Sequence, residues 1–261
     1  MSRIDLTGKR AVVTGASQGI GAAAAIALAR AGAKIAFDYK SATAEAEETA
    51  AAIREAGSEA IVLQGDTGDP AHVEELAQRA VDAWGGIDIW VNNAARLMVK
   101  PFLELTDEDW HGLLAANLHG YYYGCRSAAR RMVAQGNGGR IVNVTSIVGI
   151  QPIAELSAYV TAKGGILGLT KTLAVELGPY GITVNALSPG ATDTPLNQVA
   201  YTAEVRRNYE HRIPLGRIAS AEEIADPIVF LASDASRYVT GHELVVDEGM
   251  ILNGNVGHAR T

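Results

Sequence analysis

The stretch that decides the fold is RAVVTGASQGIG, residues 10–21. A short apolar run ends at Thr14 and a helical pattern begins at Gly19, so Gly15, Gly19 and Gly21 fall where a strand turns into a helix. Glycine lets the backbone turn sharply and approach a ligand, and the free N–H groups at a helix N-terminus attract a pyrophosphate. The spacing Gly-x3-Gly-x-Gly differs from the common fingerprint Gly-x-Gly-x-x-Gly. The stretch predicts a dinucleotide site, with an ordinary glycine-rich turn as the alternative.

The rest of the chain alternates short apolar runs with longer helical patterns. Continuous apolar runs suit strands that are buried on both faces, and helices between them imply right-handed crossovers in a parallel sheet. Strands are expected at 10–14, 34–38, 60–64, 87–91, 139–145, 181–187 and 243–246, and helices at 19–31, 42–56, 70–84, 107–135, 158–177 and 221–232. We therefore predict an α/β fold, a single doubly wound Rossmann-like domain over residues 1–261, with a parallel sheet of about seven strands and helices on both faces.

Two segments depart from this rhythm. The long helix at 107–135 has a weak point near Gly120, because glycine lowers helix stability and permits a bend. The segment at about 189–220 is long for a connection between a strand and a helix. We expect it to form a substrate lid with some helix of its own.

Composition and charge narrow the range of partners. The net charge of −7 and the pI near 5.4 argue against a surface built for nucleic acid or anionic lipid. The single cysteine, Cys125, permits no intramolecular disulfide, and the histidines show no close ligand pair, so we predict no metal site. The first residues lack a signal-peptide apolar region, and no apolar stretch is long enough to span a bilayer. We expect a cytoplasmic protein with no membrane or nucleic-acid partner.

A second group of residues points to chemistry. Tyr159 and Lys163 lie four residues apart on one helix face, and Ser146 ends the preceding strand, thirteen residues before Tyr159. Oxidising an alcohol requires a base, and the ordinary tyrosine pKa of about 10 is too high unless a nearby ammonium lowers it by about 1–3 units. Ser146 can stabilise charge on the reacting oxygen. We predict that Tyr159 is the general base in oxidation and the general acid in the reverse direction. Taken singly, these residues would be a solvated helix face and a strand-end cap.

Together these motifs resemble the short-chain dehydrogenase/reductase family. That family carries Thr-Gly-x3-Gly-x-Gly, a serine about thirteen residues before Tyr-x3-Lys, and a helical asparagine, which is Asn117 here; the match runs from about Leu6 to Asp247. The resemblance implies an NAD(P)-dependent oxidoreductase with Asn117, Ser146, Tyr159 and Lys163 as catalytic residues. It implies that Lys163 also holds the nicotinamide ribose and that Asn117 anchors a water. Family members are usually homotetramers, and the apolar helix faces, residues 121–123 included, would supply a contact or simply core.

The resemblance also assigns a cofactor pocket. Asp66 would accept a hydrogen bond from the adenine amino group, while Thr192 by its backbone and Thr194 by its hydroxyl would hold the nicotinamide end. The predicted cofactor-binding residues are Gly15, Ser17, Gln18, Gly19, Ile20, Gly21, Tyr39, Lys40, Ser41, Asp66, Thr67, Asn93, Ala94, Tyr159, Lys163, Pro189, Gly190, Thr192 and Thr194. Two positions depart from the family pattern. Ala95 replaces the glycine of Asn-Asn-Ala-Gly, and Glu248 replaces the first glycine of Asp-Gly-Gly.

The end of the second strand bears on the choice between NAD and NADP. An acidic residue there holds the ribose 2′-hydroxyl, and a basic residue favours a 2′-phosphate. The family's NAD-selecting aspartate usually falls at Tyr39, and Asp38 lies one residue early. Because alternate strand residues face opposite ways, Asp38 is expected to point away from the ribose. Lys40 and Ser41 then offer a charge and a hydroxyl, so we favour NADP, with NAD as the alternative.

The substrate is expected to be a small molecule bound between residues 146–159 and the lid. Apolar and polar side chains are mixed in both segments. By resemblance to bacterial sugar or polyol dehydrogenases we favour a sugar or polyol hydroxyl among secondary alcohols and ketones. A 3-oxoacyl-type carbonyl reductase and a catalytically silent dinucleotide-binding regulator are the alternatives. A methyltransferase with a glycine-rich loop would leave Tyr159, Lys163 and Ser146 together unexplained.

Overall fold

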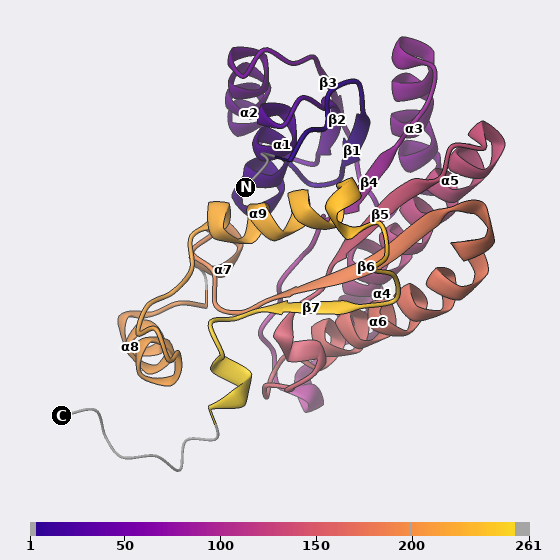
Figure 1. Ribbon diagram of the computed structural model, residues 1–261. Coiled ribbons are helices and arrows are strands. Elements are labelled where there is room, and N and C mark those ends of the chain that lie inside the picture. The colour runs from indigo at the N-terminus through magenta and orange to yellow at the C-terminus, as the bar shows by residue number, and fades with distance from the viewer. Residues whose placement is uncertain (1–3, 199, 254–261) are drawn as a thin grey trace.

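The computed structural model describes residues 4–198 and 200–253, and its seven described strands form one parallel sheet. The strands are β1 (Arg10–Val13), β2 (Lys34–Tyr39), β3 (Ala60–Gln64), β4 (Ile89–Asn92), β5 (Gly139–Val144), β6 (Ile182–Pro189) and β7 (Glu243–Val246). The helices are α1 (Gly19–Arg30), α2 (Thr43–Glu55), α3 (Pro70–Trp84), α4 (Asp107–Leu114), α5 (Gly120–Gln135), α6 (Ser157–Leu177), α7 (Pro195–Gln198), α8 (Ala203–Arg212) and α9 (Ala221–Leu231). The predicted parallel α/β fold is confirmed (Figure 1).

Helices cover both faces of the sheet, and the strand residues alternate between two cores. Val13 packs into a cluster with residues of α1, α2 and α9, whereas Val12 packs into a second cluster with residues of α3, α5 and α6. Both valines are fully buried. Because each face meets helices, every strand position favours an apolar side chain, which is the reason for the continuous runs in the sequence.

The strand order is β3-β2-β1-β4-β5-β6-β7. The chain builds outward from β1 to one edge and then starts again on the other side of β1 with β4, so the connections diverge between these two strands. In open parallel sheets a ligand binds outside the carboxyl ends of the strands at this point. The glycine turn after β1 lies there.

The two irregular segments have identifiable structures. The weak point in the long helix is one turn of π-helix at Ala115–His119, directly before Gly120, and not a simple bend. Such turns are rare and occur frequently at functional sites. The segment after β6 holds the short helices α7 and α8, which project beside the sheet in Figure 1. A parallel bridge between Thr192 and Ala219 ties the base of this segment together.

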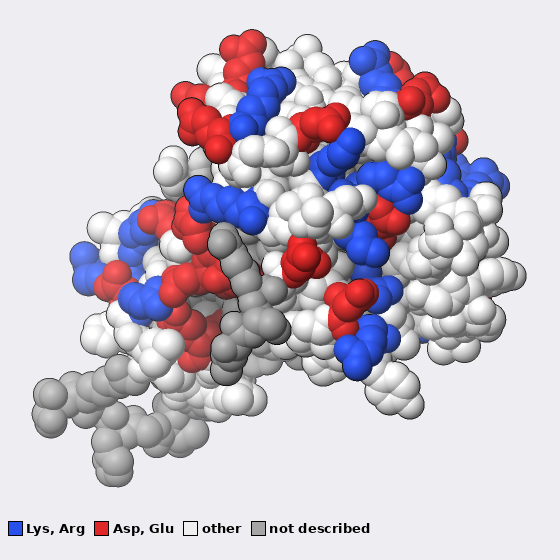
Figure 2. All heavy atoms as spheres, turned by 45° about the horizontal axis from the view of Figure 1, so that its top comes forward, with Lys and Arg blue, Asp and Glu red and all other residues white. Residues whose placement is uncertain are grey.

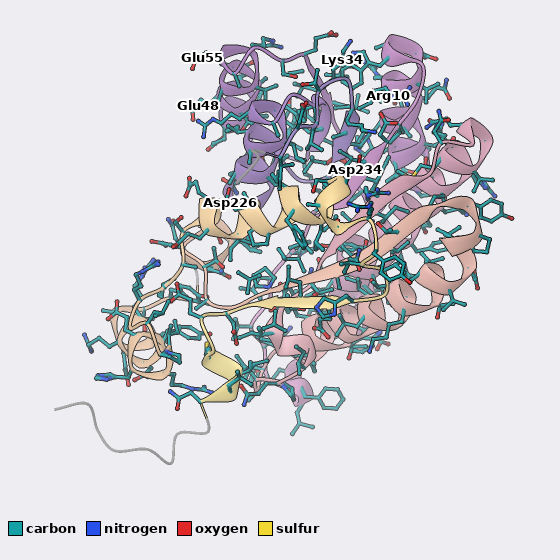
Figure 3. The ribbon with its side chains drawn as sticks, in the orientation of Figure 1. Arg10, Lys34, Glu48, Glu55, Asp226 and Asp234 are labelled. Atoms are coloured by element: carbon teal, nitrogen blue, oxygen red, sulfur yellow. The ribbon has the colours of Figure 1, made fainter. Side chains whose placement is uncertain are left out.

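Charged side chains lie at the amino ends of the strands, opposite the glycine turn, and over the surface. At the amino ends of the strands Arg10 pairs with Asp88 at 2.7 Å, and Arg140 pairs with Asp234 at 3.0 Å. Figure 3 labels Arg10 and Asp234. On the face shown in Figure 2, acidic and basic residues lie interspersed. Among the described residues, none of the helices has the length and apolar character needed to cross a membrane.

Candidate active site

The glycine turn is packed so tightly that its backbone has little freedom. Gly15 has φ +65°, and a Cβ atom there would lie 2.6 Å from Cα of Ala94. A Cβ atom on Gly21 would lie 2.3 Å from the carbonyl oxygen of Gly15. Only glycine fits these positions, because a methyl group would have to displace backbone atoms. Gln18, which precedes α1, makes no side-chain capping bond, so the first N–H groups of the helix are free for a ligand.

Residues after β4 hold this turn in place. The Asn93 side-chain amide donates to the carbonyl oxygens of Thr14 at 3.0 Å and Gly15 at 2.9 Å. The Thr14 hydroxyl accepts from the backbone N–H groups of Asn93 at 3.0 Å and Ala94 at 3.2 Å. Asn93 and Ala94 therefore connect the two strands at the point where the topology diverges, and they fix the shape of the turn.

A cavity of about 290 Å³ lies over the glycine turn and suits an adenosine with its phosphates. The structure gathers most of the predicted cofactor residues around it, namely Gly15, Ser17, Gln18, Gly19, Ile20, Tyr39, Lys40, Ser41, Asp66, Thr67, Asn93, Ala94 and Thr194. Gly21 packs beneath the turn instead of lining the cavity. Free N–H groups, hydroxyls and one lysine are the donors that a dinucleotide requires, so these residues fit such a group.

Two of the predicted cofactor residues are paired with each other. Lys40 Nζ lies 2.5 Å from Oδ2 of Asp66, and Asp66 Oδ1 accepts from the N–H of Gly68 at 2.9 Å. Burial alone would raise the pKa of Asp66, but the bonds from Lys40 and Gly68 hold it below its ordinary value. The prediction treated Lys40 as a free charge for a 2′-phosphate and Asp66 as a free acceptor for adenine. In the structure, the Lys40 ammonium and the Asp66 carboxylate are instead hydrogen-bonded to each other.

A second cavity, of about 310 Å³, contains the predicted catalytic side chains. Ser146, Tyr159 and Lys163 line it, together with Pro189, Gly190 and Thr192 from the end of β6 and the turn after it. The two cavities share Ile20, Asn93, Ala95, Thr194 and Leu196 in their walls. An extended ligand can therefore lie over the glycine turn and reach the catalytic side chains. Ala95, the departure from the family pattern, lies at this junction.

Lys163 is buried and bound to groups that the sequence did not single out. Its Nζ donates to the carbonyl oxygen of Val144 at 2.8 Å and to the hydroxyl of Tyr121 at 3.1 Å. The Tyr121 hydroxyl donates in turn to the same carbonyl oxygen at 2.7 Å. The sequence predicts Tyr121 as part of an apolar helix face. The sequence feature that could have identified Tyr121 as a site residue is its position, one helical turn after Asn117 on the same helix face.

The expected lowering of the Tyr159 pKa by Lys163 is wrong. Burial raises the pKa of Tyr159 to about 12 and lowers the pKa of Lys163 to about 7. Both shifts have the same cause, since a buried site disfavours the charged form of each side chain. The Lys163 ammonium also directs two of its three N–H groups to Val144 and Tyr121. Additional positive charge is therefore needed to release the phenol proton near neutral pH.

Asn117 lies in the π-helical turn, and its side chain makes two hydrogen bonds to one residue of a distant segment. Its Oδ1 accepts from the N–H of Arg96 and its Nδ2 donates to the carbonyl oxygen of Arg96, both at 2.7 Å. The residue has no exposed surface. The side-chain amide thus anchors the segment after β4 to the long helix. The role of Asn117 in anchoring a water stays a prediction.

Comparison with known proteins identifies the family. The sequence family described as Enoyl-(Acyl carrier protein) reductase matches residues 15–251. L-rhamnose 1-dehydrogenase (NAD(P)(+)) of Sphingomonas sp. (strain SKA58) is 40% identical over 249 residues, which cover 95% of this chain and 98% of the relative. The chain belongs to the short-chain dehydrogenase/reductase family.

Two further relatives of this short-chain dehydrogenase/reductase differ in what their names describe. The 3beta-hydroxysteroid dehydrogenase 1 of Eggerthella lenta is 40% identical over 249 residues, covering 95% of each chain. A crystal structure of a short-chain dehydrogenase from Burkholderia cenocepacia J2315 in complex with NADP has a TM-score of 0.89 and 37% identity, and it covers 94% of this chain and 99% of that one. The predicted family and reaction class are confirmed: the chain is an oxidoreductase for CH–OH groups.

Proposed function

We propose that this enzyme transfers hydride between a nicotinamide dinucleotide and a secondary alcohol or the matching carbonyl compound, with Tyr159 as the general acid and base. The observation that carries the proposal is the shared cavity, in which Ser146, Tyr159 and Lys163 meet beside the cavity over the glycine turn. A bound dinucleotide supplies the hydride acceptor in oxidation and the hydride donor in reduction. The residues of the chain bind the reacting oxygen and move its proton.

Proton transfer at Tyr159 requires a hydrogen-bond donor for the substrate oxygen and positive charge near the phenol. In oxidation, Ser146 donates a hydrogen bond to the substrate oxygen and the Tyr159 phenolate takes its proton. Burial opposes phenolate formation by about 3 kcal/mol, since it raises the pKa of Tyr159 to about 12 from an ordinary value near 10. Protonated Lys163 and an oxidised nicotinamide both bring positive charge into the site and lower that cost. Tyr121 and Val144 keep the Lys163 ammonium in place.

For the cofactor we propose NADP first and NAD second. Lys40 and Ser41 line the cavity over the glycine turn beside Tyr39, where a family member selective for NAD usually has an aspartate. Support also comes from the related crystal structure in complex with NADP and from the relative whose name gives NAD(P)(+). Lys40 would have to leave Asp66 to reach a 2′-phosphate. The carboxylate would then be free to accept from adenine.

For the substrate we propose a compact ring that carries a secondary or anomeric hydroxyl, with sugars first. Apolar side chains such as Val148, Leu156 and Val205 form much of the catalytic cavity, and Glu155, Asn197, Tyr201 and Tyr209 are among its polar groups outside the catalytic set. A sugar has an apolar face and hydroxyl edges, which fits this mixture, and a relative at 40% identity is an L-rhamnose 1-dehydrogenase. The same apolar walls, together with the name of the steroid-acting relative, support a hydroxysteroid as the second candidate.

A substrate panel with both cofactors tests the proposal. The absorbance of reduced nicotinamide is followed with sugars, polyols, hydroxysteroids and β-ketoesters, for the wild type, Ser146→Ala and Ser157→Ala. Ser157 lies outside the lining of the catalytic cavity and is the matched control. We expect turnover with at least one ring alcohol and a loss of about 100-fold or more in Ser146→Ala alone. Cofactor binding without turnover of any substrate would favour the silent regulator.

We further propose a homotetramer in the cytoplasm. Large apolar side chains are exposed at separate places on the surface, among them Leu103, Tyr122, Val175 and Tyr238. A homotetramer needs more than one contact surface on each subunit, and these side chains lie on different segments of the chain. Size-exclusion chromatography with light scattering of the purified protein tests the tetramer, and a monomer at micromolar concentration would contradict it.

A further inference from the structure

A buried acid and base lie directly beneath the glycine turn. The Asp38 carboxylate, 1% exposed, accepts from the N–H of Gly15 at 2.6 Å through Oδ1. Its Oδ2 lies 3.0 Å from Nε2 of His72 on α3. The backbone oxygen of Asp38 accepts from Ala16 at 3.0 Å. Asp38 thus supports the turn from below instead of facing a ribose, and His72 completes its hydrogen bonding.

The residues around His72 leave space for its ring beside Asp38. His72 is 8% exposed, and a Cβ atom on Gly65 would lie 2.0 Å from its Nδ1, so the glycine makes room for the ring. The charged groups around the ring are Asp38 on β2, Asp66 after β3, and Asp69 and Glu75 at the start of α3. All four are acidic, and they attract a proton to the imidazole.

The charge of this pair acts on the cofactor cavity. Asp38 lines that cavity together with Lys40 and Ser41, the groups expected at the 2′ position. With a protonated His72 the pair is neutral, whereas with a neutral His72 it carries one negative charge. A buried negative charge beside this position repels a 2′-phosphate much more than a 2′-hydroxyl.

We propose that His72 is a specificity-determining residue for the cofactor: when protonated it offsets Asp38 and permits a 2′-phosphate, and when neutral it favours the 2′-hydroxyl of NAD. The proposal rests on the proposed use of a nicotinamide dinucleotide. Burial by itself would lower the pKa of His72, but the hydrogen bond and charge of Asp38 and the charges of Glu75 and Asp69 raise it above its ordinary value. The preference for NADP should therefore fall as the pH rises through the pKa of His72.

Equilibrium binding tests this without any substrate. The dissociation constants of NADPH and NADH are measured by fluorescence between about pH 6 and pH 8.5, for the wild type, His72→Gln and Asp38→Asn, with the exposed His111→Gln as the control. Over this pH range, the ratio of the NADPH dissociation constant to the NADH dissociation constant should rise in the wild type. The rise should be about tenfold larger than in His72→Gln. The variant still reports the titration of the 2′-phosphate itself, whose pKa is about 6.

The two variants should change the affinity for NADPH in opposite directions relative to the wild type. His72→Gln keeps a donor for Asp38 but cannot become charged, so it should bind NADPH weakly at every pH. Asp38→Asn keeps an acceptor for Gly15 without charge, so it should bind NADPH tightly at every pH. Equal losses for both cofactors in His72→Gln, or a wild-type ratio that stays constant above pH 7, would overturn the inference. Failure of the wild type to bind either cofactor would instead overturn the proposed function.

Discussion

Burial of Lys163 has a consequence for folding stability that can be measured apart from catalysis. Burial lowers the pKa of Lys163 from 10.5 to about 7, so between these values the unfolded chain holds the proton and the folded chain does not. Stability must then rise with pH in this window, because the unfolded state binds more protons. At about 1.4 kcal/mol for each pH unit, with Lys163 half-titrated at the start, raising the pH from 7 to 9 adds about 2 kcal/mol.

Urea unfolding of wild type and Lys163→Met at pH 7, 8 and 9 isolates this contribution. Methionine fills a similar volume and cannot be charged, so the difference in unfolding free energy between the two proteins should change by about 2 kcal/mol over the range. Lys171→Met, which removes an exposed lysine from the same helix, is the control and should run parallel to the wild type. The raised pKa of Tyr159 acts in the opposite direction only above its ordinary value near 10, outside the range. Parallel curves for wild type and Lys163→Met would refute the reasoning.

Three further substitutions test other parts of the structure. Gly15→Ala places a methyl group 2.6 Å from Cα of Ala94 at a residue with φ +65°, and it should weaken cofactor binding, measured by calorimetry, at least tenfold. The control is Gly168→Ala, in a helix with open space around the added Cβ atom. It should leave cofactor binding unchanged and add about 0.5–1 kcal/mol of stability. Glu248→Gly relieves φ +55° and should raise Tm by about 2–4 °C, a gain that Glu248→Ala should lack. Tyr121→Phe removes a partner of the Lys163 ammonium and should shift the pH profile of kcat while leaving KM for the cofactor unchanged; an unaltered profile would count against its positioning role.

The fold could be predicted from the sequence because both faces of the sheet are buried. Short continuous apolar runs mark the strands, and their spacing leaves room only for crossover helices. The glycine turn and Tyr159 with Lys163 could also be found, because their chemistry depends on near neighbours in the sequence. Glu248 was recognised as a departure from glycine, and the structure shows that it has a positive φ of 55°, a conformation that glycine adopts most readily.

Contacts between distant segments could not be predicted. Lys163 meets a tyrosine 42 residues earlier, and Asp38 meets a histidine 34 residues later. Neither pair has a spacing that marks it, since each depends on how β2, α3, α5 and α6 pack across the sheet. The direction of the pKa shift of Tyr159 was predicted wrongly for the same reason. Burial outweighs one neighbouring ammonium, and burial is a property of the packed structure.

The most direct test of Tyr159 as the general acid and base is to measure both turnover and cofactor binding in Tyr159→Phe. Phenylalanine retains the ring and its packing and removes only the hydroxyl that exchanges the proton. We expect kcat to fall by about 10²–10⁴-fold while the dissociation constant of the reduced cofactor stays within about twofold. Retention of most of the wild-type turnover with intact binding would show that another group moves the proton, and the assignment of this site would then be wrong.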